Sequence, residues 1–247
     1  MNPILLIPAR LASTRLPAKP LADIGGVPMI VRVLRQAEAA GLGPVAVAAG
    51  EAEITAAVKA AGGQAVLTDP DLPSGSDRIY AALEKLDPER RHDVVINLQG
   101  DLPALDPAQI RAVAAALGDS GADIATLAAE IVDPAERDNP SVVKAVVAWE
   151  RDGRRGRALY FTRATAPTGD GPLFHHVGIY AYRRDALTRF VGLPPSPLEL
   201  REKLEQLRAL EANMSIAVAR VDSVPLSVDT PADLAKAQQY FARKILS

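Results

Sequence analysis

Short apolar, β-branched runs alternate with amphipathic stretches through the first half of the chain. Such runs are typical of strands that are buried on both faces of a parallel sheet. In the stretches between them apolar residues recur every three or four positions, which predicts helices with one buried face. The predicted strands are Ile4–Ile7, Val45–Ala49, Gln64–Leu67, Val94–Leu98 and Asp123–Leu127. The predicted helices are Val27–Ala40, Glu51–Ala61, Ser76–Leu86 and Pro107–Leu117.

This order of elements predicts an α/β fold, a mainly parallel sheet with helices on both faces. The pattern changes near Asp138, where strands follow one another and Asp152-Gly153 marks a hairpin turn. The later predicted elements are strands Val142–Ala148, Ala158–Phe161, His176–Tyr182 and Ser215–Val221, and helices Leu198–Asn213 and Pro231–Ile245. We therefore divide the chain into an α/β domain of residues 1–138 plus 215–247 and an inserted, smaller α+β region of residues 139–214.

The composition is that of an ordinary folded protein: 247 residues, 48% hydrophobic and 23% charged, with a formal net charge of −2. It excludes global disorder, and without a basic excess we expect no nucleic-acid partner. The absence of cysteine excludes disulfides, thiol nucleophiles and zinc–thiolate sites, and three histidines are too few to favour an all-histidine zinc site. We therefore expect any metal ion to be a hard cation held by carboxylates and phosphates. The N-terminus lacks a signal-peptide pattern, and no apolar run approaches the ~20 residues of a membrane helix. We expect a cytoplasmic protein without a membrane partner.

The segment after the first strand carries positive charge without any acidic residue. Its cations are Arg10, Arg15 and Lys19, and the first acidic residue of the chain is Asp23. Three prolines stiffen the loop, which leaves the carboxyl end of a strand, where α/β sheets bind ligands. The pattern favours a polyphosphate ligand over a solvated loop. It matches neither a P-loop nor a dinucleotide-binding glycine fingerprint.

Two aspartates are candidate ligands for such a cation. Asp101 directly follows the strand Val94–Leu98 and Gln99-Gly100, a usual place for a carboxylate that binds a phosphate-bound Mg²⁺. Asp229 follows a strand-like run that ends near Val228, far away in the sequence. From the residues alone, Asp101 could equally serve as a turn residue or a helix cap, and Asp229 is better explained as a cap of the last helix.

Nine segments together resemble the sugar nucleotidyltransferases, and most closely the 3-deoxy-manno-octulosonate (Kdo) cytidylyltransferase family. They are Pro8–Leu21, Asp23–Ile30, Ser74–Arg78, Asn97–Asp101, Tyr160–Ala164, His176–Tyr180, Ser196–Glu199, Glu205–Arg208 and Val228–Pro231. They occur in the family's order and span nearly the whole chain. The resemblance implies a nucleotide-diphospho-sugar transferase-like, Rossmann-like fold, with nucleotide binding in the α/β domain and sugar binding and dimerisation in the inserted region.

The resemblance also implies the reaction and its residues. CMP would pass from CTP to the anomeric hydroxyl of Kdo, which gives CMP-Kdo and pyrophosphate for lipopolysaccharide biosynthesis. The implied nucleotide-binding residues are Pro8, Ala9, Arg10, Lys19, Ser74, Arg78, Gln99 and Asp101. The implied catalytic residues are Arg10, Arg15, Lys19, Asp101 and Asp229, and the last two would hold the Mg²⁺ cofactor. The implied sugar-binding residues are Gln99, Arg163, His176, Tyr180, Glu205 and Gln206; of the two adjacent histidines we prefer His176 over His175.

The chain departs from the family pattern at two positions, because Gly50 and Leu102 stand where the family usually has acidic residues. The loop Thr165–Leu173 is also shorter than expected. These departures keep three alternatives open: a cytidylyltransferase for 8-amino-Kdo or another acidic sugar, an enzyme that uses another nucleotide, and a non-catalytic protein that binds sugar nucleotides. The resemblance implies a homodimer.

Overall fold

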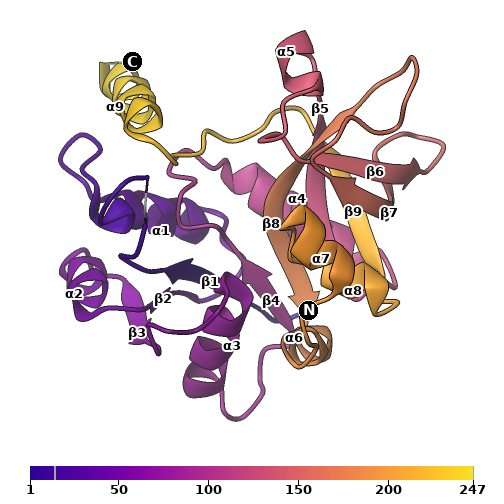
Figure 1. Ribbon diagram of the computed structural model, residues 1–247. Coiled ribbons are helices and arrows are strands. Elements are labelled where there is room, and N and C mark those ends of the chain that lie inside the picture. The colour runs from indigo at the N-terminus through magenta and orange to yellow at the C-terminus, as the bar shows by residue number, and fades with distance from the viewer. Residues whose placement is uncertain (14, 247) are drawn as a thin grey trace. The chain divides into compact units, whose positions relative to one another are not determined.

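The computed structural model describes residues 1–13 and 15–246; Thr14, within the segment Pro8–Leu21, and Ser247 lie outside the described residues. The chain forms two compact units (Figure 1). The first consists of Met1–Ala108 and Pro225–Ser247, and the second of Gln109–Val224. Within the described ranges no helix is long and apolar enough to cross a membrane.

The first unit is built on four parallel strands. They are β1 (Pro3–Ala9), β2 (Val45–Ala49), β3 (Gln64–Leu67) and β4 (Val94–Asn97), hydrogen-bonded in the order β3-β2-β1-β4. In this register Ala9 lies opposite Ala49, and Leu6 lies opposite Asn97. The carboxyl ends of β1 and β4 are therefore neighbours, although the strands are far apart in the sequence.

Helices cover both faces of these strands. α1 (Met29–Ala39) and α2 (Ala52–Ala60) connect strands in one direction across the sheet, and α3 (Gly75–Leu86) returns in the other, from β3 to β4. Because such crossovers are right-handed, the return helix lies on the opposite face from the other two. All four residues of β4 are buried, as a doubly covered strand requires. A 3₁₀ turn (η1, Lys19–Leu21) and the last helix α9 (Pro231–Leu246) complete the unit.

The second unit contains five strands in a mixed arrangement. They are β5 (Ile124–Glu130), β6 (Lys144–Trp149), β7 (Arg155–Thr162), β8 (Phe174–Arg183) and β9 (Ile216–Val221), in the order β8-β5-β9-β7-β6. Only β5 and β9 pair in parallel among the described pairings of this unit. β6 also meets β8 through Lys144 and His175, so the sheet curls back on itself. Its helices are α4 (Pro107–Gly118), which starts at the unit boundary, α5 (Pro134–Arg137), α6 (Arg184–Val191), α7 (Pro197–Glu202) and α8 (Gln206–Glu211).

The structure confirms the α/β class and the strand–helix order of the first half, and differs from the sequence prediction in three places. The unit boundary follows Ala108 rather than residue 138, because β5 pairs with β8 and β9 and so belongs with the later strands. The single helix predicted over Leu198–Asn213 is two short helices, because Lys203 takes a left-handed conformation (φ 57°) that ends α7. The short helices α5 and α6 were not predicted.

Candidate functional site

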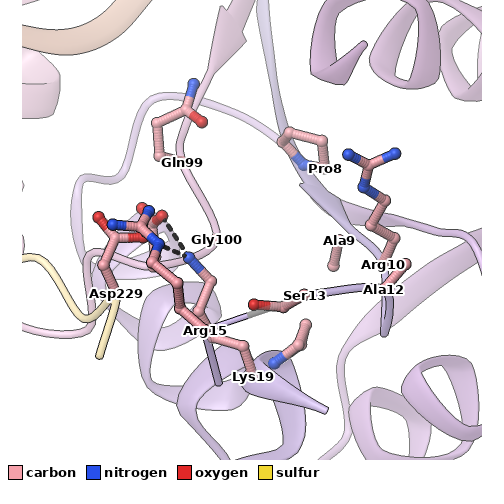
Figure 2. Close-up of a pocket in the computed structure, with 12 residues that line it drawn as sticks. Pro8, Ala9, Arg10, Ala12, Ser13, Arg15, Lys19, Gln99, Gly100 and Asp229 are labelled. Atoms are coloured by element: carbon pink, nitrogen blue, oxygen red, sulfur yellow. Dashed lines mark hydrogen bonds and ion pairs between the residues drawn. The ribbon is translucent and has the colours of Figure 1, made fainter. Parts of the chain in front are cut away.

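A cavity of about 440 Å³ opens where β1 and β4 end (Figure 2). From β1 the chain crosses to β2, whereas from β4 it continues into α4 and the second unit, and such a switch point is where parallel sheets bind ligands. Its lining comes from the loop after β1, the turn after β4 and the segment before α9. The lining residues are Pro8, Ala9, Arg10, Ala12, Ser13, Arg15, Lys19, Pro20, Gln99, Gly100, Asp101 and Asp229. Seven of the residues predicted for nucleotide binding or catalysis, from the end of β1, the loop after it and the turn after β4, thus lie around one cavity with Asp229.

Lys19 joins the two candidate metal ligands. Its Nζ lies 2.8 Å from Asp101 Oδ2 and 3.1 Å from Asp229 Oδ1. The guanidinium of Arg15 adds a second ion pair to Asp229 at 3.0 Å, and Figure 2 shows both cations reaching this carboxylate. Burial alone would lower the pKa of Lys19, but the two carboxylates outweigh that effect and raise it. The ammonium therefore stays charged at neutral pH.

The backbone explains why Asp229 reaches Asp101 across such a long sequence separation. The N–H of Val228 donates to the carbonyl oxygen of Asp101 at 3.0 Å, and Val228 is itself fully buried beside Ile24 and Met29. The α9 cap is supplied by Thr230, whose hydroxyl accepts the N–H of Asp233 at 3.3 Å. The cap thus leaves the Asp229 side chain available to the cavity.

Asp101 is likewise released from a capping role. The first turn of α4 is capped by Asp106, whose Oδ1 accepts the N–H of Ala108 at 2.8 Å. Each of the two helices is thus capped by another side chain, and the role of Asp101 and Asp229 as metal ligands stays a prediction. Both carboxylates face the cations of the loop after β1.

The donor set fits a magnesium ion that is bound together with a phosphate. In the described part of the chain no cluster of three or more His, Cys, Asp or Glu side chains could hold a metal ion. Two carboxylates that converge on one ammonium can equally converge on one divalent cation. Mg²⁺ commonly takes one or two protein carboxylates and completes its octahedron with water and substrate phosphates.

A second, smaller cavity of about 140 Å³ shares Pro8, Ala9, Arg10 and Gln99 with the first. Its other lining residues are Leu72, Ser74, Gly75 and Arg78. Ser74 caps α3, since its hydroxyl accepts the N–H of Asp77 at 3.1 Å. All the residues predicted for the nucleotide therefore line these two adjoining cavities of the first unit.

Arg78 lies almost fully buried at the wall of the smaller cavity. Its guanidinium donates to Thr68 Oγ1 at 2.8 Å and to the carbonyl oxygens of Asp69 (2.9 Å) and Pro70 (3.0 Å). These bonds fix the turn after β3 against α3. Arg78 shapes the cavity by holding that turn in place.

The two positions that depart from the family pattern have distinct surroundings. A Cβ at Gly50 would lie 3.0 Å from Arg78 Nη1 and 3.4 Å from Arg10 Cβ, so a side chain there would press against both arginines. Leu102 is buried in the core and is not among the cavity residues. Neither position contributes a charge to the site.

The residues predicted for the sugar, Gln99 apart, lie in the second unit. His176 and Tyr180 of β8 are buried with ring centroids 5.6 Å apart. Burial raises the pKa of the Tyr180 phenol, and the neighbouring Tyr182 and then Glu205 raise it further. Gln206 is buried, and its Nε2 has no hydrogen-bond partner within the described residues. These four side chains form a polar group that could read the hydroxyls of a sugar.

Arg163 is engaged with the backbone. Its Nε donates to the carbonyl oxygen of Glu202 at 2.8 Å and its Nη1 to that of Pro140 at 3.0 Å. Its own N–H donates to the Glu202 carboxylate at 3.0 Å. A third, longer bond runs from its Nη2 to the carbonyl oxygen of Lys203 at 3.5 Å. The remaining guanidinium donors are available for a carboxylate.

His176 also predicts a pH dependence of stability. Burial, with a smaller effect of His175, lowers the pKa of His176 to about 3, and its Nε2 lies 3.0 Å from Thr126 Oγ1. In the unfolded chain its pKa is about 6.5, so below that value the unfolded state binds a proton that the folded state refuses. We expect the free energy of unfolding to fall by up to ~1.4 kcal/mol per pH unit from pH 6.5 toward 4 on this account.

His176→Gln keeps a side chain that can hydrogen-bond to Thr126 and removes this titration. Urea unfolding of both proteins from pH 7.5 to pH 4.5 isolates it, because all other groups titrate in both. The free energy of unfolding of wild type minus that of the variant is expected to decrease as the pH falls. A difference that stays constant with pH would contradict the lowered pKa of His176 as its cause.

Thr126 and Glu51, which were not predicted, hold segments of the site in place. Thr126, fully buried in β5, also donates to the carbonyl oxygen of Ile179 at 2.8 Å and so fixes the strand that carries His176. Glu51 accepts the N–H of Leu11 in the loop after β1 at 2.9 Å. The sequence offers no signal for either, since a threonine in a strand and a glutamate before a helix are both commonplace.

A family model, curated relatives and a solved structure all relate this chain to cytidylyltransferases. The family described as cytidylyltransferase matches residues 4–216. A protein of Parvibaculum lavamentivorans is 66% identical over 98% of this chain and 94% of its own, and one of Rhodospirillum centenum is 65% identical over 96% and 92%. Both carry the name 3-deoxy-manno-octulosonate cytidylyltransferase. The solved structure of a CMP:2-keto-3-deoxy-manno-octonic acid synthetase complexed with CTP is 38% identical, with a TM-score of 0.90 over 99% of this chain and 100% of that one.

Proposed function

The chain belongs to the cytidylyltransferase family, and from that premise we propose that it transfers CMP from CTP to the anomeric hydroxyl of Kdo, with release of pyrophosphate. The observation that carries the proposal is the cavity at the ends of β1 and β4, where the cations of one loop face two carboxylates. The relative solved with CTP supports the choice of nucleotide. The names of the relatives support the choice of sugar.

The residues of the first unit act by positioning and by neutralising charge. Arg10, Arg15 and Lys19 bind the triphosphate, and they stabilise the charge that builds on pyrophosphate as it leaves. Asp101 and Asp229 hold Mg²⁺, which when bound neutralises phosphate charge and favours deprotonation of the attacking hydroxyl. No histidine lines the cavity among the described residues. Alignment of the hydroxyl with the α-phosphorus therefore supplies much of the rate.

The polar group of the second unit supplies the sugar selectivity. His176 is neutral at working pH, so it reads a hydroxyl and does not pair with the sugar carboxylate. Arg163 is the cation for that carboxylate, through the guanidinium donors that the backbone leaves available. An acidic eight-carbon sugar offers both kinds of partner.

The product of this reaction would serve lipopolysaccharide biosynthesis, the role that the name of the relatives implies. We place the reaction in the cytoplasm as part of the same proposal. We further propose a homodimer, on family membership. Sedimentation equilibrium is expected to return the mass of two chains of 26.1 kDa. The mass of one chain would contradict the dimer and leave the reaction untouched.

Pyrophosphate release by the purified protein tests the reaction. In the first series the concentrations of CTP and Mg²⁺ are fixed, and Kdo, 8-amino-Kdo and a sialic acid are compared as acceptors. In the second series Kdo is kept, and CTP is replaced in turn by each of the other three nucleoside triphosphates. Release with CTP and Kdo that EDTA abolishes is the expected result. Release only with another sugar or nucleotide would overturn that substrate. CTP binding without release for any sugar would favour a binding protein.

A further inference from the structure

Glu51 connects the loop after β1 to the start of α2. It occupies the position before the first helical residue, from which a side chain commonly caps its own helix. Here the side chain makes no such bond. Its Oε2 instead accepts the N–H of Leu11 at 2.9 Å, across 40 positions of sequence. The carboxylate at the start of α2 thus binds the backbone of the basic loop and not that of its own helix.

The same carboxylate offsets the charge of Arg78, which the nearby Arg10 also affects. Burial lowers the pKa of Arg78. Among its charged neighbours, Glu51 raises this pKa the most, and Arg10 lowers it further. The position of a Cβ at Gly50 lies 3.0 Å from Arg78 Nη1 and 3.4 Å from Arg10 Cβ, so both arginines pass beside the turn that leads into Glu51. Without Glu51 these cations would repel each other with less compensation.

Two other side chains of the loop, Arg15 and Lys19, bind the candidate metal ligands. Arg15 binds Asp229, and Lys19 binds both Asp229 and Asp101. Those ion pairs must exchange partners when a cation and a triphosphate bind. The bond from Leu11 to Glu51 is not part of that exchange, since Glu51 is absent from the described lining of both cavities.

We infer that Glu51 is a positioning residue for the nucleotide: it fixes the Arg10–Leu11 peptide and so keeps Arg10 at the edge that the two cavities share. The ligand in this inference, CTP, rests on the proposed function, whereas the tether itself does not. Such a residue acts through Arg10 and touches neither substrate nor metal.

Kinetics with CTP provide the first test. Glu51→Ala is expected to raise KM for CTP about tenfold and to change kcat by less than about threefold, because a charge-assisted bond that preorganises binding is lost. Glu51→Gln keeps an acceptor for Leu11 and is expected to raise KM by about threefold at most. The matched control is Glu53→Ala, which removes an exposed acidic side chain from the first turn of the same helix. An unchanged KM in Glu51→Ala, or an equal rise in Glu53→Ala, would overturn the inference.

Trypsin provides a test that needs no activity. The enzyme cleaves after Arg10 and Arg15 but not after Lys19, which precedes Pro20. The N–H of the Arg10–Leu11 bond is the group that Glu51 holds, so Glu51→Ala is expected to be cleaved there several-fold faster than wild type. Cleavage after Arg154, in the exposed β6–β7 turn, serves as the internal reference. Equal cleavage after Arg10 in both proteins would overturn the tether.

The two tests separate the inference from the proposed function. If the wild-type protein releases no pyrophosphate with any sugar, the proposed reaction fails, and the cleavage ratio still decides the role of Glu51. If Glu51→Ala does not fold, Glu51→Gln decides: its cleavage after Arg10 should match wild type, and its KM should stay within about threefold. Rapid cleavage of that variant would then overturn the inference.

Discussion

Asp101→Asn is expected to lose at least about a thousandfold in kcat while the protein stays folded. The substitution removes one of the two carboxylates that converge on Lys19 and with it half of the proposed protein ligands for Mg²⁺. The hydrogen bond that holds Asp229 in place uses the backbone carbonyl of residue 101, so it survives the change. The loss should therefore reflect charge and not displacement of Asp229.

Two measurements make this expectation specific. The free energy of unfolding, measured by thermal unfolding, should fall by no more than ~1 kcal/mol, because the lost ion pair is partly exposed and the Asp101 side chain is 26% exposed. Pyrophosphate release should fall in Asp229→Asn by a similar factor, and should be unaffected by Asp170→Asn, which removes an exposed acid from a loop of the second unit. Turnover of Asp101→Asn within tenfold of wild type would contradict the metal assignment.

The parts of the fold that the sequence predicts depend on local pattern. The strands that form β1 to β4 are short, mainly apolar runs between amphipathic stretches, and the loop with Arg10, Arg15 and Lys19 is marked by its charge, its prolines and its place after a strand. The position of Asp101 follows from the same pattern, since it directly follows a buried strand. Local sequence decides each of these features.

What the sequence does not predict depends on partners that are distant along the chain. The approach of Asp229 to Asp101 is set by the bond from Val228 and by its burial, and only the family resemblance pairs the two in advance. The unit boundary depends on which strands β5 joins. The break at Lys203 is a choice of backbone conformation that an amphipathic pattern does not reveal.

Lys19→Met is expected to have two consequences: turnover falls, and Mg²⁺ stabilises the folded protein more than it stabilises wild type. Turnover should fall by about a hundredfold or more, because a fixed positive charge on the triphosphate is lost. In the protein without nucleotide, the ammonium lies between the two carboxylates at 2.8 and 3.1 Å, where a divalent cation would have to compete with it. Its removal leaves Asp229 paired with the mostly exposed Arg15 and takes away the ion pair of Asp101.

Thermal unfolding with and without Mg²⁺ checks the second consequence. A ligand that binds only the folded state stabilises it by RT ln(1 + [L]/Kd), so competition by Lys19 should keep the wild-type response small. At about 10 mM Mg²⁺ we expect the midpoint of Lys19→Met to rise by about 3 °C more than that of wild type. Lys59→Met, at the exposed end of α2, removes a lysine away from the cavity and should respond as wild type does. Equal responses in all three proteins would mean that Lys19 does not compete with the metal, and that its pairing with the two carboxylates is not the resting state of the site.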